Sequence, residues 1–428
     1  MRLVVLGAGI MGLAAAHHAL DRGWDVTVLE AAPQAGGMAA HFDLGGLSIE
    51  RFYHFICRAD APTFALLDEL GLRDSLRWVP TSMGYFIGGR LHPWGDPVSL
   101  LRFPHLSLVE KLRYGLMAFL ATKRRDPGRL EHISAREWIT AWCGQAVYDK
   151  LWAPLFDLKF HEHADRVSAA WIWTRLKRIG TSRRSLMQEE LGYLEGGSET
   201  LVRALERTIA ARGGRVLLGQ PASRIHVADG RVTGVTAGGE IHPAEAVIGT
   251  IPTPLLGGLL AEAPGLADAY ATIRNIGVVC VVLRLGRSVT PHFWVNVSDP
   301  RSRIPGFVEF SNLRPMDGEA VVYVPYYMPS DHARFGMDDL AFRDEAMEHL
   351  RMVNPAIGPE DLRSWHVGRL RHAQPVCPPG FAAGLPPVRT PVQGLQLADT
   401  AFYYPEDRGV SESARFGRMM AQALPLAR

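Results

Sequence analysis

The chain has 428 residues, more than one hydrophobic core usually supports, so we expect two domains. Hydrophobic residues make up 47% and charged residues 21%, which is typical of a soluble globular protein and not of a disordered one. Lys and Arg number 46 and Asp and Glu 44, so no basic excess of the kind that nucleic-acid binding requires is present.

The first thirty residues predict a βαβ unit. Residues 2–6 form a short apolar run of strand type, and residues 10–22 are rich in Ala and Leu, as expected for a helix that stops at Gly23. Residues 25–29 read as a second strand. This order is the structural context that a dinucleotide-binding glycine motif requires.

Gly7, Gly9 and Gly12 fit the pattern G-x-G-x-x-G, and Glu30 follows the second predicted strand. The glycines allow a tight turn, a close approach of the backbone to a pyrophosphate, and close packing of helix on strand. The pyrophosphate is expected at the helix N-terminus, where N–H groups are free, and Glu30 is expected to bind the ribose. The predicted cofactor-binding set around this motif also includes Ile10, Met11 and Ala31.

After a predicted helix at residues 61–69, residues 80–190 are rich in tryptophan and show helical periodicity. Within them, residues 106–125 are amphipathic and end in a basic cluster. This segment is predicted either to pack on its own domain or to lie on a membrane surface, and the first alternative is favoured. No run of about eighteen apolar residues predicts a membrane span, and no signal peptide is expected, because a predicted strand begins at residue 2.

The α/β pattern returns near residue 190. A helix is predicted at residues 199–212, followed by short strands with a tight turn at Asp229-Gly230. Later segments predict strands, a helix at residues 338–352, and a closing helix from Val410 to Leu424. One α/β domain is therefore expected from residues 1–75, 190–255 and 388–428, and a mixed α+β, partly helical substrate domain from residues 76–189 and 256–387.

The cofactor is predicted to be FAD. A Gly36-Gly37 pair follows the acidic residue and brings backbone close to the cofactor again. At the far end of the chain, Asp399 follows a strand, and Gly409 precedes a helix, which gives a second anchor that only a long cofactor needs. No second G-x-G-x-x-G is present for NAD.

These motifs resemble, over nearly the whole chain, the FAD-dependent flavin amine oxidase and protoporphyrinogen oxidase superfamily, which also includes phytoene desaturases and UDP-galactopyranose mutase. The resemblance rests on the glycine motif with "AGGM", "EGGSETL", "VIGTIP" and "LADT…YPEDRGVSESARFG". It implies a Rossmann-like FAD-binding domain of the glutathione-reductase type. It also implies FAD contacts from Gly36, Gly37, Met38, Ala222, Asp399, Gly409 and Val410.

The sequence departs from this superfamily in two ways. The usual R-x-G-G is replaced by Gln34-Ala35-Gly36-Gly37, so an expected guanidinium is missing. Many amine oxidases of the superfamily also carry a lysine late in the substrate domain that holds a water against the flavin. The five lysines here end at Lys177, so a plain amine oxidase is disfavoured.

Candidate catalytic residues are Arg51, His54 and Tyr404. His54 has the residue type for acid or base chemistry, and Arg51 for binding a carboxylate or phosphate. Packing roles are the competing interpretation for the aromatic residues beside them. His161 and His163 lack a partner motif, so no metal site is predicted.

The leading hypothesis is an FAD-dependent oxidoreductase that passes a hydride from a small organic substrate to flavin N5, with FAD bound non-covalently. The alternatives are a flavin-dependent sugar-nucleotide mutase, which the arginines at positions 51, 274, 314, 369 and 371 would suit, and a non-catalytic flavin-binding protein. The four scattered cysteines predict free thiols in a reducing compartment. A cytoplasmic location is expected, with peripheral membrane contact through residues 106–125 as an option. No oligomeric state is predicted.

Overall fold

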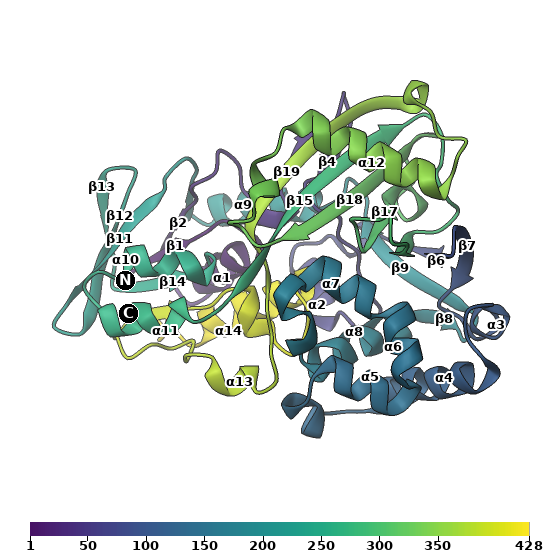
Figure 1. Cartoon of the computed structure of the whole chain (residues 1–428). Helices are drawn as coiled ribbons and strands as arrows, with labels where there is room; N and C mark the ends of the chain where they lie inside the picture. Colours follow the sequence, from purple (N-terminus) through teal and green to yellow (C-terminus); the bar gives the residue numbers. More distant parts are fainter. Residues whose placement is uncertain (428) are drawn as a thin grey trace.

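The computed structural model describes residues 1–427. A parallel sheet with both chain termini lies at the left in Figure 1, and a larger sheet and a group of helices lie at the right. The five-stranded parallel sheet has the order β10-β2-β1-β14-β20. Its strands are β1 (Arg2–Leu6), β2 (Asp25–Leu29), β10 (Arg215–Leu217), β14 (Ala246–Gly249) and β20 (Leu395–Leu397).

The parallel sheet is buried on both faces, which explains its continuous apolar strands. After the first residue of β1 and of β2, each strand is fully buried, and β14 and β20 are buried throughout. The strands of this sheet come from three separated parts of the chain: β1 and β2, then β10 and β14, and finally β20. Strand β14 joins these parts, since it pairs with β1 on one side and with β20 on the other.

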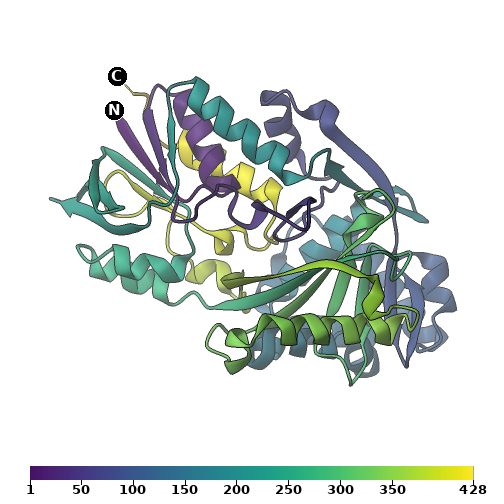
Figure 2. The same cartoon turned by 90° about the horizontal axis from the view of Figure 1, so that it is seen from above.

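Three helices pack beside this sheet, as Figure 2 shows: α1 (Ile10–Leu20), α9 (Ser198–Ala211) and α14 (Val410–Gln422). Helices α1 and α14 approach closely, since a Cβ on Gly417 would lie 2.5 Å from the carbonyl oxygen of Met11. The N-terminal and C-terminal segments also lie side by side (Figure 1). The Trp24 indole, just before β2, donates to the carbonyl of Pro425, just after α14.

A small antiparallel sheet extends from this part of the molecule. Its strands are β11 (Ala222–Ala228), β12 (Arg231–Ala237) and β13 (Glu240–Pro243). The predicted tight turn at Asp229-Gly230 joins β11 to β12, with positive φ at both residues. Type I′ turns require that geometry, so the short-range signal was sufficient here.

The second large sheet is mixed and has the order β19-β15-β18-β17-β16-β6-β7. Its central strands β15 and β18 are almost completely buried, and helix α12 (Asp339–Val353) lies along it (Figure 2). The strands are β6 (Met83–Ile87), β7 (Arg90–Trp94), β15 (Asn275–Leu285), β16 (Trp294–Ser298), β17 (Gly306–Glu309), β18 (Ala320–Met328) and β19 (Leu362–Pro375). Two shorter sheets contain β3 (His41–Asp43) with β4 (Ser48–Glu50), and β5 (Leu76–Thr81) with β8 (Arg183–Ser185) and β9 (Gln188–Leu194).

Helices gather below this sheet in Figure 1, around a core rich in aromatic side chains. Trp138, Trp171 and Trp173 are all buried, which accounts for the tryptophan-rich segment of the sequence. The helices of this region are α3 (Pro97–Arg102), α4 (Leu108–Lys123), α5 (Ala135–Cys143), α6 (Gln145–Leu151), α7 (Ala153–Phe160) and α8 (Ala169–Thr181). The remaining helices are α2 (Ala61–Glu69), α10 (Leu256–Leu259), α11 (Pro264–Ala271) and α13 (Phe381–Gly384).

The expected fold class, an α/β Rossmann-like domain with a mixed α+β partner, is confirmed by this architecture. The two-domain division at the boundaries given above stays a proposal. It is supported by β6 and β7, which join the same sheet as strands from residues 275–375. In residues 1–427 no helix combines the length and the apolar character needed to traverse a bilayer.

We predict that Gly417→Ala destabilises the protein although alanine favours helices. The added Cβ would lie 2.5 Å from the Met11 carbonyl oxygen and 2.8 Å from the Ala14 Cβ, so α14 must move away from α1. Overpacking of this kind costs about 1–3 kcal/mol in the free energy of unfolding, measured by denaturant titration. Gly257→Ala, with open space around its Cβ position, is the control and should not destabilise. Equal stability of both variants would show that the two helices do not depend on this contact.

Candidate functional site

The carboxyl ends of three parallel strands meet at one edge of the sheet. The amide of Thr250, after β14, donates to the Leu6 carbonyl at the end of β1, at 2.9 Å. The amide of Ala398, after β20, donates to the Gly249 carbonyl, at 3.0 Å. In α/β sheets, ligands bind outside the carboxyl ends of the strands, so this edge is the candidate site.

The glycine motif forms the turn from β1 into α1 at this edge. Gly7 has φ +96°, a value that disfavours other residues, and a Cβ on Gly12 would lie 1.9 Å from the Gly7 carbonyl oxygen. Gly9 is the N-cap of α1, and nothing lies within 4 Å of its Cβ position. The first N–H groups of α1, including those of Ile10 and Met11, thus begin beside open space, as anion binding at a helix N-terminus requires.

The Gly36-Gly37 pair lies against this turn. Gly36 pairs with Gly9 in a parallel bridge, and its amide donates to the Ala8 carbonyl at 2.8 Å. A Cβ on Gly37 would lie 3.3 Å from the Gly9 Cα. The structure therefore brings together the two glycine segments that the sequence predicts at one pyrophosphate, with Met38 in the short 3-10 helix that follows.

Glu30 joins the loops on either side of it. Its carboxylate accepts hydrogen bonds from the amides of Ala8, at 2.7 Å, and Ala32, at 2.9 Å. The Glu30 carbonyl also accepts from the Gln220 amide, so the segment that leads into Ala222 lies beside it. Ala31 is exposed next to this carboxylate. The predicted adenosine-binding residues are thus neighbours, with Glu30 fixed by two backbone donors.

Asp399 lies at the end of β20 and is buried. Its carboxylate accepts from the amides of Thr253, at 2.7 Å, and Ala401, at 2.8 Å. Burial raises the pKa of Asp399, and the two backbone donors oppose that rise. Its main contacts are therefore with the chain turn around it, and a direct contact with a cofactor stays a prediction.

Gly409 is the N-cap of α14 and, like Gly9, has open space at its Cβ position. Val410 begins the helix. Because α14 packs on α1 through Gly417, two helix N-termini belong to one rigid unit. The open glycine turns, the braced acid and the second helix start fit the anchors that the extended FAD molecule requires.

The segment from Glu50 to His54 packs against the second large sheet, because Tyr53 contacts side chains of β16 and β18. Glu50 is buried, accepts from the Ser198 amide at 3.0 Å, and pairs with Arg314 at 3.2 Å. These contacts indicate a structural role. The Arg51 side chain is half-buried beside His366, which it influences electrostatically.

His54 and Tyr53 lie among aromatic and basic groups. Burial lowers the pKa of His54 to about 4, and Arg408 contributes in the same direction. Its Nδ1 atom is buried without a hydrogen-bond partner in residues 1–427. Tyr53 packs edge-on against Trp294 and Tyr323, and burial raises its pKa well above the usual value. His54 is therefore neutral at pH 7.

The Tyr404 hydroxyl is engaged elsewhere. It donates to the Glu131 carboxylate at 2.7 Å and lies 2.7 Å from the Ser168 hydroxyl. These partners come from the helical region, so Tyr404 ties that region to the segment before α14. Its catalytic role stays a prediction, as do those of Arg51 and His54.

Three basic side chains surround the rings of Trp171 and Tyr327, and one of them, Arg408, lies just before α14. The Trp171 ring centroid lies 4.8 Å from the Arg175 guanidinium and 5.1 Å from the Lys159 ammonium. The Tyr327 ring centroid lies 5.0 Å from Lys159, and its hydroxyl lies 3.5 Å from Arg408. We call these residues, with Asp407, the cationic cluster.

Asp407 is the carboxylate that partners this cluster, through an ion pair with Arg175. Arg408 also donates to the Gln374 side chain. Burial lowers the pKa of Lys159 well below its ordinary value, and the neighbouring Arg175 and Arg408 lower it further. Asp407 thus forms an ion pair with Arg175, and the charges of Arg408 and Lys159 also help to lower its pKa against the effect of burial.

Sequence reasoning missed Lys159 and Arg175. Both lie on helices of the tryptophan-rich segment, more than 230 residues before Arg408 in the chain, so no local pattern links them. The signal that was available is the context of Lys159, a single basic residue in the apolar run "WAPLFDLKF". A lysine in such a run is half-buried by its neighbours.

Three of the arginines that the sequence suggested for binding a diphosphate have different contact partners and do not form one group. Arg314 pairs with Glu50, and Arg369 pairs with Asp339 and donates to the carbonyls of residues 335 and 337. Arg371 donates to the Ser330 carbonyl. These contacts do not favour a sugar-nucleotide site.

His17, His18 and Glu69 form a group with the donor types of a metal site. Glu69, however, pairs with Arg418, and burial together with His17 and Arg418 lowers the pKa of His18 to about 4. The Arg418 guanidinium already provides the positive charge that pairs with Glu69, so these three residues do not support a metal site.

A family model described as flavin-containing amine oxidoreductase matches residues 10–406. A 15-cis-phytoene desaturase from Synechococcus elongatus is 26% identical over 290 residues, covering 61% of this chain and 60% of the desaturase. Protoporphyrinogen oxidase from Bos taurus is 28% identical over 322 residues, 66% of each chain. The matches thus span less than two thirds of both relatives. An oxidoreductase from Methanosarcina mazei has a TM-score of 0.76 at 19% identity, covering 99% of this chain and 100% of that chain.

We predict that Glu30→Ala weakens FAD binding and leaves the fold intact. The variant loses a charge-assisted ribose contact and the two hydrogen bonds to Ala8 and Ala32, at a cost of about 2 kcal/mol. Titration of the apoprotein with FAD, followed by flavin fluorescence, measures the loss. Glu240→Ala, an exposed acid on β13, is the control. Unchanged FAD affinity in Glu30→Ala would mean that this carboxylate only braces the loops.

We predict that His54 makes the protein less stable in mild acid. Its pKa is about 4 in the folded state against 6.5 unfolded, so the unfolded chain binds more protons between these values. Stability is therefore complete above about pH 6.5 and falls as pH decreases toward 4. The difference in thermal midpoint between pH 7 and pH 5 should be smaller in His54→Gln. An identical pH dependence in the variant would contradict a buried neutral histidine.

Proposed function

Since the chain belongs to the flavin-containing amine oxidoreductase family, whose members are FAD-dependent oxidoreductases, we propose that it oxidises a small organic substrate by hydride transfer to flavin N5. FAD would be held by the glycine turn at Gly7 to Gly12, by Glu30, by the Gly36-Gly37 pair and by the start of α14 at Gly409. When bound, FAD supplies the hydride acceptor.

The cationic cluster carries our proposal for the substrate class. Burying like charges is costly unless opposite charge neutralises them, and Asp407 supplies one carboxylate for the two guanidinium groups of Arg175 and Arg408. The N-terminus of α14, directly after Arg408, adds partial positive charge. An anionic group on the substrate would complete the balance, so we propose a substrate that bears a carboxylate or a similar acid.

The same charges disfavour simple amines. A protonated amine is a cation, and the guanidinium groups of Arg175 and Arg408 would repel it where the local dielectric is low. The aromatic rings of Trp171 and Tyr327 are already in contact with cations of the protein itself. The cluster therefore supports an oxidase or dehydrogenase that does not act on ordinary mono- and polyamines.

Lys159 also has the protonation behaviour of a base. Its lowered pKa means that its Nζ atom gives up its proton more readily than an exposed lysine does. We propose that Nζ accepts the proton that leaves an N–H or O–H group of the substrate while the neighbouring C–H is oxidised. The two arginines keep their charge and orient the anionic group.

We predict that flavin reduction under anaerobic conditions depends on substrate charge. Mixing the oxidised holoenzyme with matched compounds should bleach the flavin band faster for an acid-bearing compound than for its neutral ester or for an amine. Arg408→Gln should lower the apparent affinity for the acid by roughly tenfold or more, because one charge-assisted contact is lost. Lys159→Met should slow reduction and remove its rise with pH.

The matched control is Lys177→Met, whose ammonium contacts Trp173 outside the cluster. Faster reduction by a simple amine than by any acid would contradict the proposed substrate class. Turnover of a sugar nucleotide only by the chemically reduced enzyme would instead support the mutase. A flavin that no compound reduces and that supports no isomerisation would indicate a binding protein.

A further inference from the structure

One face of α4 has no partner among the described residues. Leu108, Val109 and Leu112 expose 60–65% of their surface, and Leu116 and Phe119 expose more than half. The opposite face, with Tyr114, Met117 and Ala121, is buried against the helical region. The helix is therefore apolar on both sides, which is unusual for a helix that has water as its only outer neighbour.

The exposed apolar surface continues onto neighbouring segments. Leu101 of α3 is exposed, and α3 is held to α4 by the Lys111 ammonium, which donates to the Leu101 carbonyl at 2.7 Å. Leu186 and Met187 project from the turn between β8 and β9, and Arg183 ties this turn to Gly95 just before α3. We call these exposed side chains of α3, α4 and the β8–β9 turn the apolar face.

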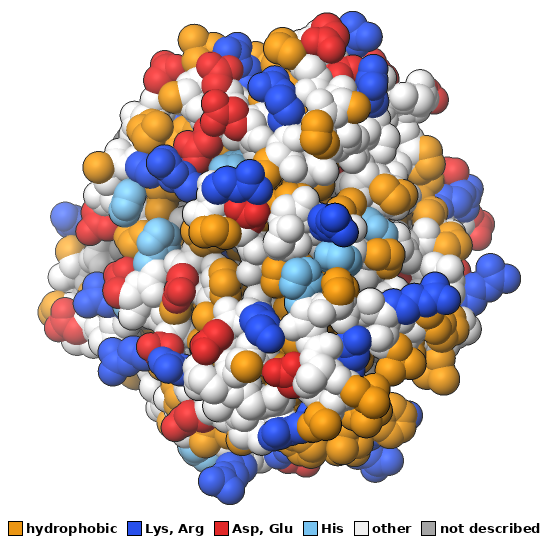
Figure 3. Space-filling model, turned by 45° about the vertical axis from the view of Figure 1, so that its right-hand side comes forward, with side chains coloured by type: hydrophobic (Ala, Val, Ile, Leu, Met, Phe, Trp, Pro, Cys, Tyr) orange, Lys and Arg blue, Asp and Glu red, His pale blue; other side chains and the backbone are white. Residues whose placement is uncertain are grey.

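Basic residues surround the apolar face. Residues 101–125 contain six Arg or Lys and one acid, although the whole chain has a formal net charge of only +2. Two of the nearby acids are engaged at helix N-termini: Asp96 accepts from the amides at the start of α3, and Glu110 accepts from the Ser107 amide. Asp126, next to Arg125, is exposed and leaves the basic residues in excess. In Figure 3, hydrophobic side chains gather at the lower right with Lys and Arg side chains beside them.

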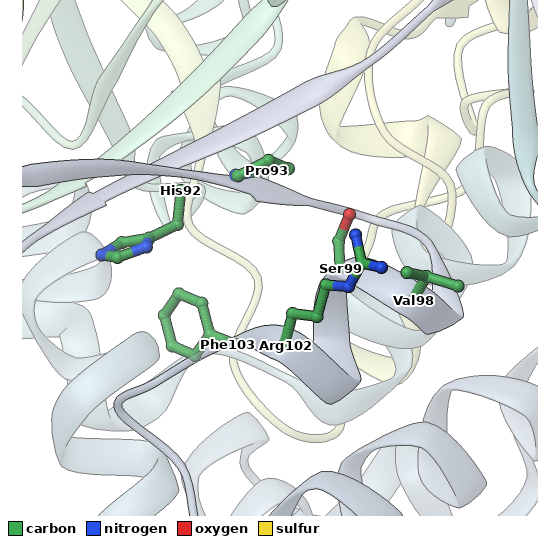
Figure 4. A pocket seen from close by; sticks show the side chains of 6 residues that line it. All are labelled: His92, Pro93, Val98, Ser99, Arg102 and Phe103. Atoms are coloured by element: carbon green, nitrogen blue, oxygen red, sulfur yellow. The ribbon is translucent and has the colours of Figure 1, made fainter.

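A small pocket lies at the rim of this surface. It has a volume of about 110 Å³ and lies between β7 and α3, where His92, Ser99 and Arg102 line it (Figure 4). It is too small for the cofactor or an organic substrate of drug size. A guanidinium, an imidazole and a hydroxyl there add to the polar, basic border of the apolar face.

We propose that the apolar face docks on an anionic lipid bilayer. Leucine and phenylalanine side chains would enter the interface between headgroups and acyl chains, while Lys123, Arg125 and Arg184 contact the headgroup phosphates. Charge decides against a second copy of the chain as the occupant, because two such faces would bring their basic borders together. This docking is independent of the substrate chemistry proposed above.

The test measures sedimentation of the holoenzyme with phosphatidylcholine vesicles that contain or lack phosphatidylglycerol. Binding to the anionic vesicles is expected, with weaker binding to neutral ones and at high salt. The triple variant Leu112→Ser, Leu116→Ser, Phe119→Ser should lose binding. The double variant Lys123→Gln, Arg125→Gln should lower the partition coefficient by roughly tenfold or more, and only on anionic vesicles.

Matched controls are Ile241→Ser, an equally exposed apolar residue on β13, and the double variant Arg207→Gln, Arg231→Gln, on the far part of the molecule. Both should bind like the parent protein. Flavin content shows that every variant is folded. The proposal is overturned if the parent ignores anionic vesicles, if the triple variant binds them as the parent does, or if sedimentation velocity shows a parent dimer that the triple variant loses while neither binds vesicles.

Discussion

The candidate site depends on two places where backbone meets backbone without an intervening side chain. At Gly12, helix α1 rests on the Gly7 carbonyl, and at Gly417, helix α14 rests on the Met11 carbonyl. A Cβ at either position would lie within 2.5 Å of a carbonyl oxygen, so the two segments would have to move apart. The two contacts fix both helix N-termini at the carboxyl edge of the parallel sheet. The FAD site that we propose depends on that arrangement.

Much of the fold could be predicted because its signals are local. The βαβ unit, the turn at Asp229-Gly230 and the helix at residues 61–69 each follow from residues that are adjacent in sequence. The meeting of Gly9 with Gly36 was also within reach, since both flank the same two strands. Where a glycine pattern follows directly on a strand, few backbone conformations of the turn into the helix are possible.

The substrate side could not be predicted to the same extent, because its contacts cross the whole chain. Asp399 is predicted near the cofactor, and its carboxylate accepts from the sequence-distant amide of Thr253 and from the nearby amide of Ala401. The Tyr404 hydroxyl contacts Glu131 and Ser168, which are also distant in sequence. Lys159 lies 249 residues before Arg408, so no local sequence pattern links the two residues. Folding places it beside Arg408, where electrostatics depends on distance in space.

The parallel sheet also constrains how the protein can be made. Its central strand β1 is synthesised first, whereas its edge strand β20 and helix α14 come from the last forty residues. Until those residues leave the ribosome, β14 has an open edge and α1 lacks the helix that covers it. Domains fold as units during synthesis only when their parts are present. The parallel sheet and the helix pair α1 and α14 are therefore complete only when the last forty residues are available, so the proposed FAD site depends on the C-terminal segment.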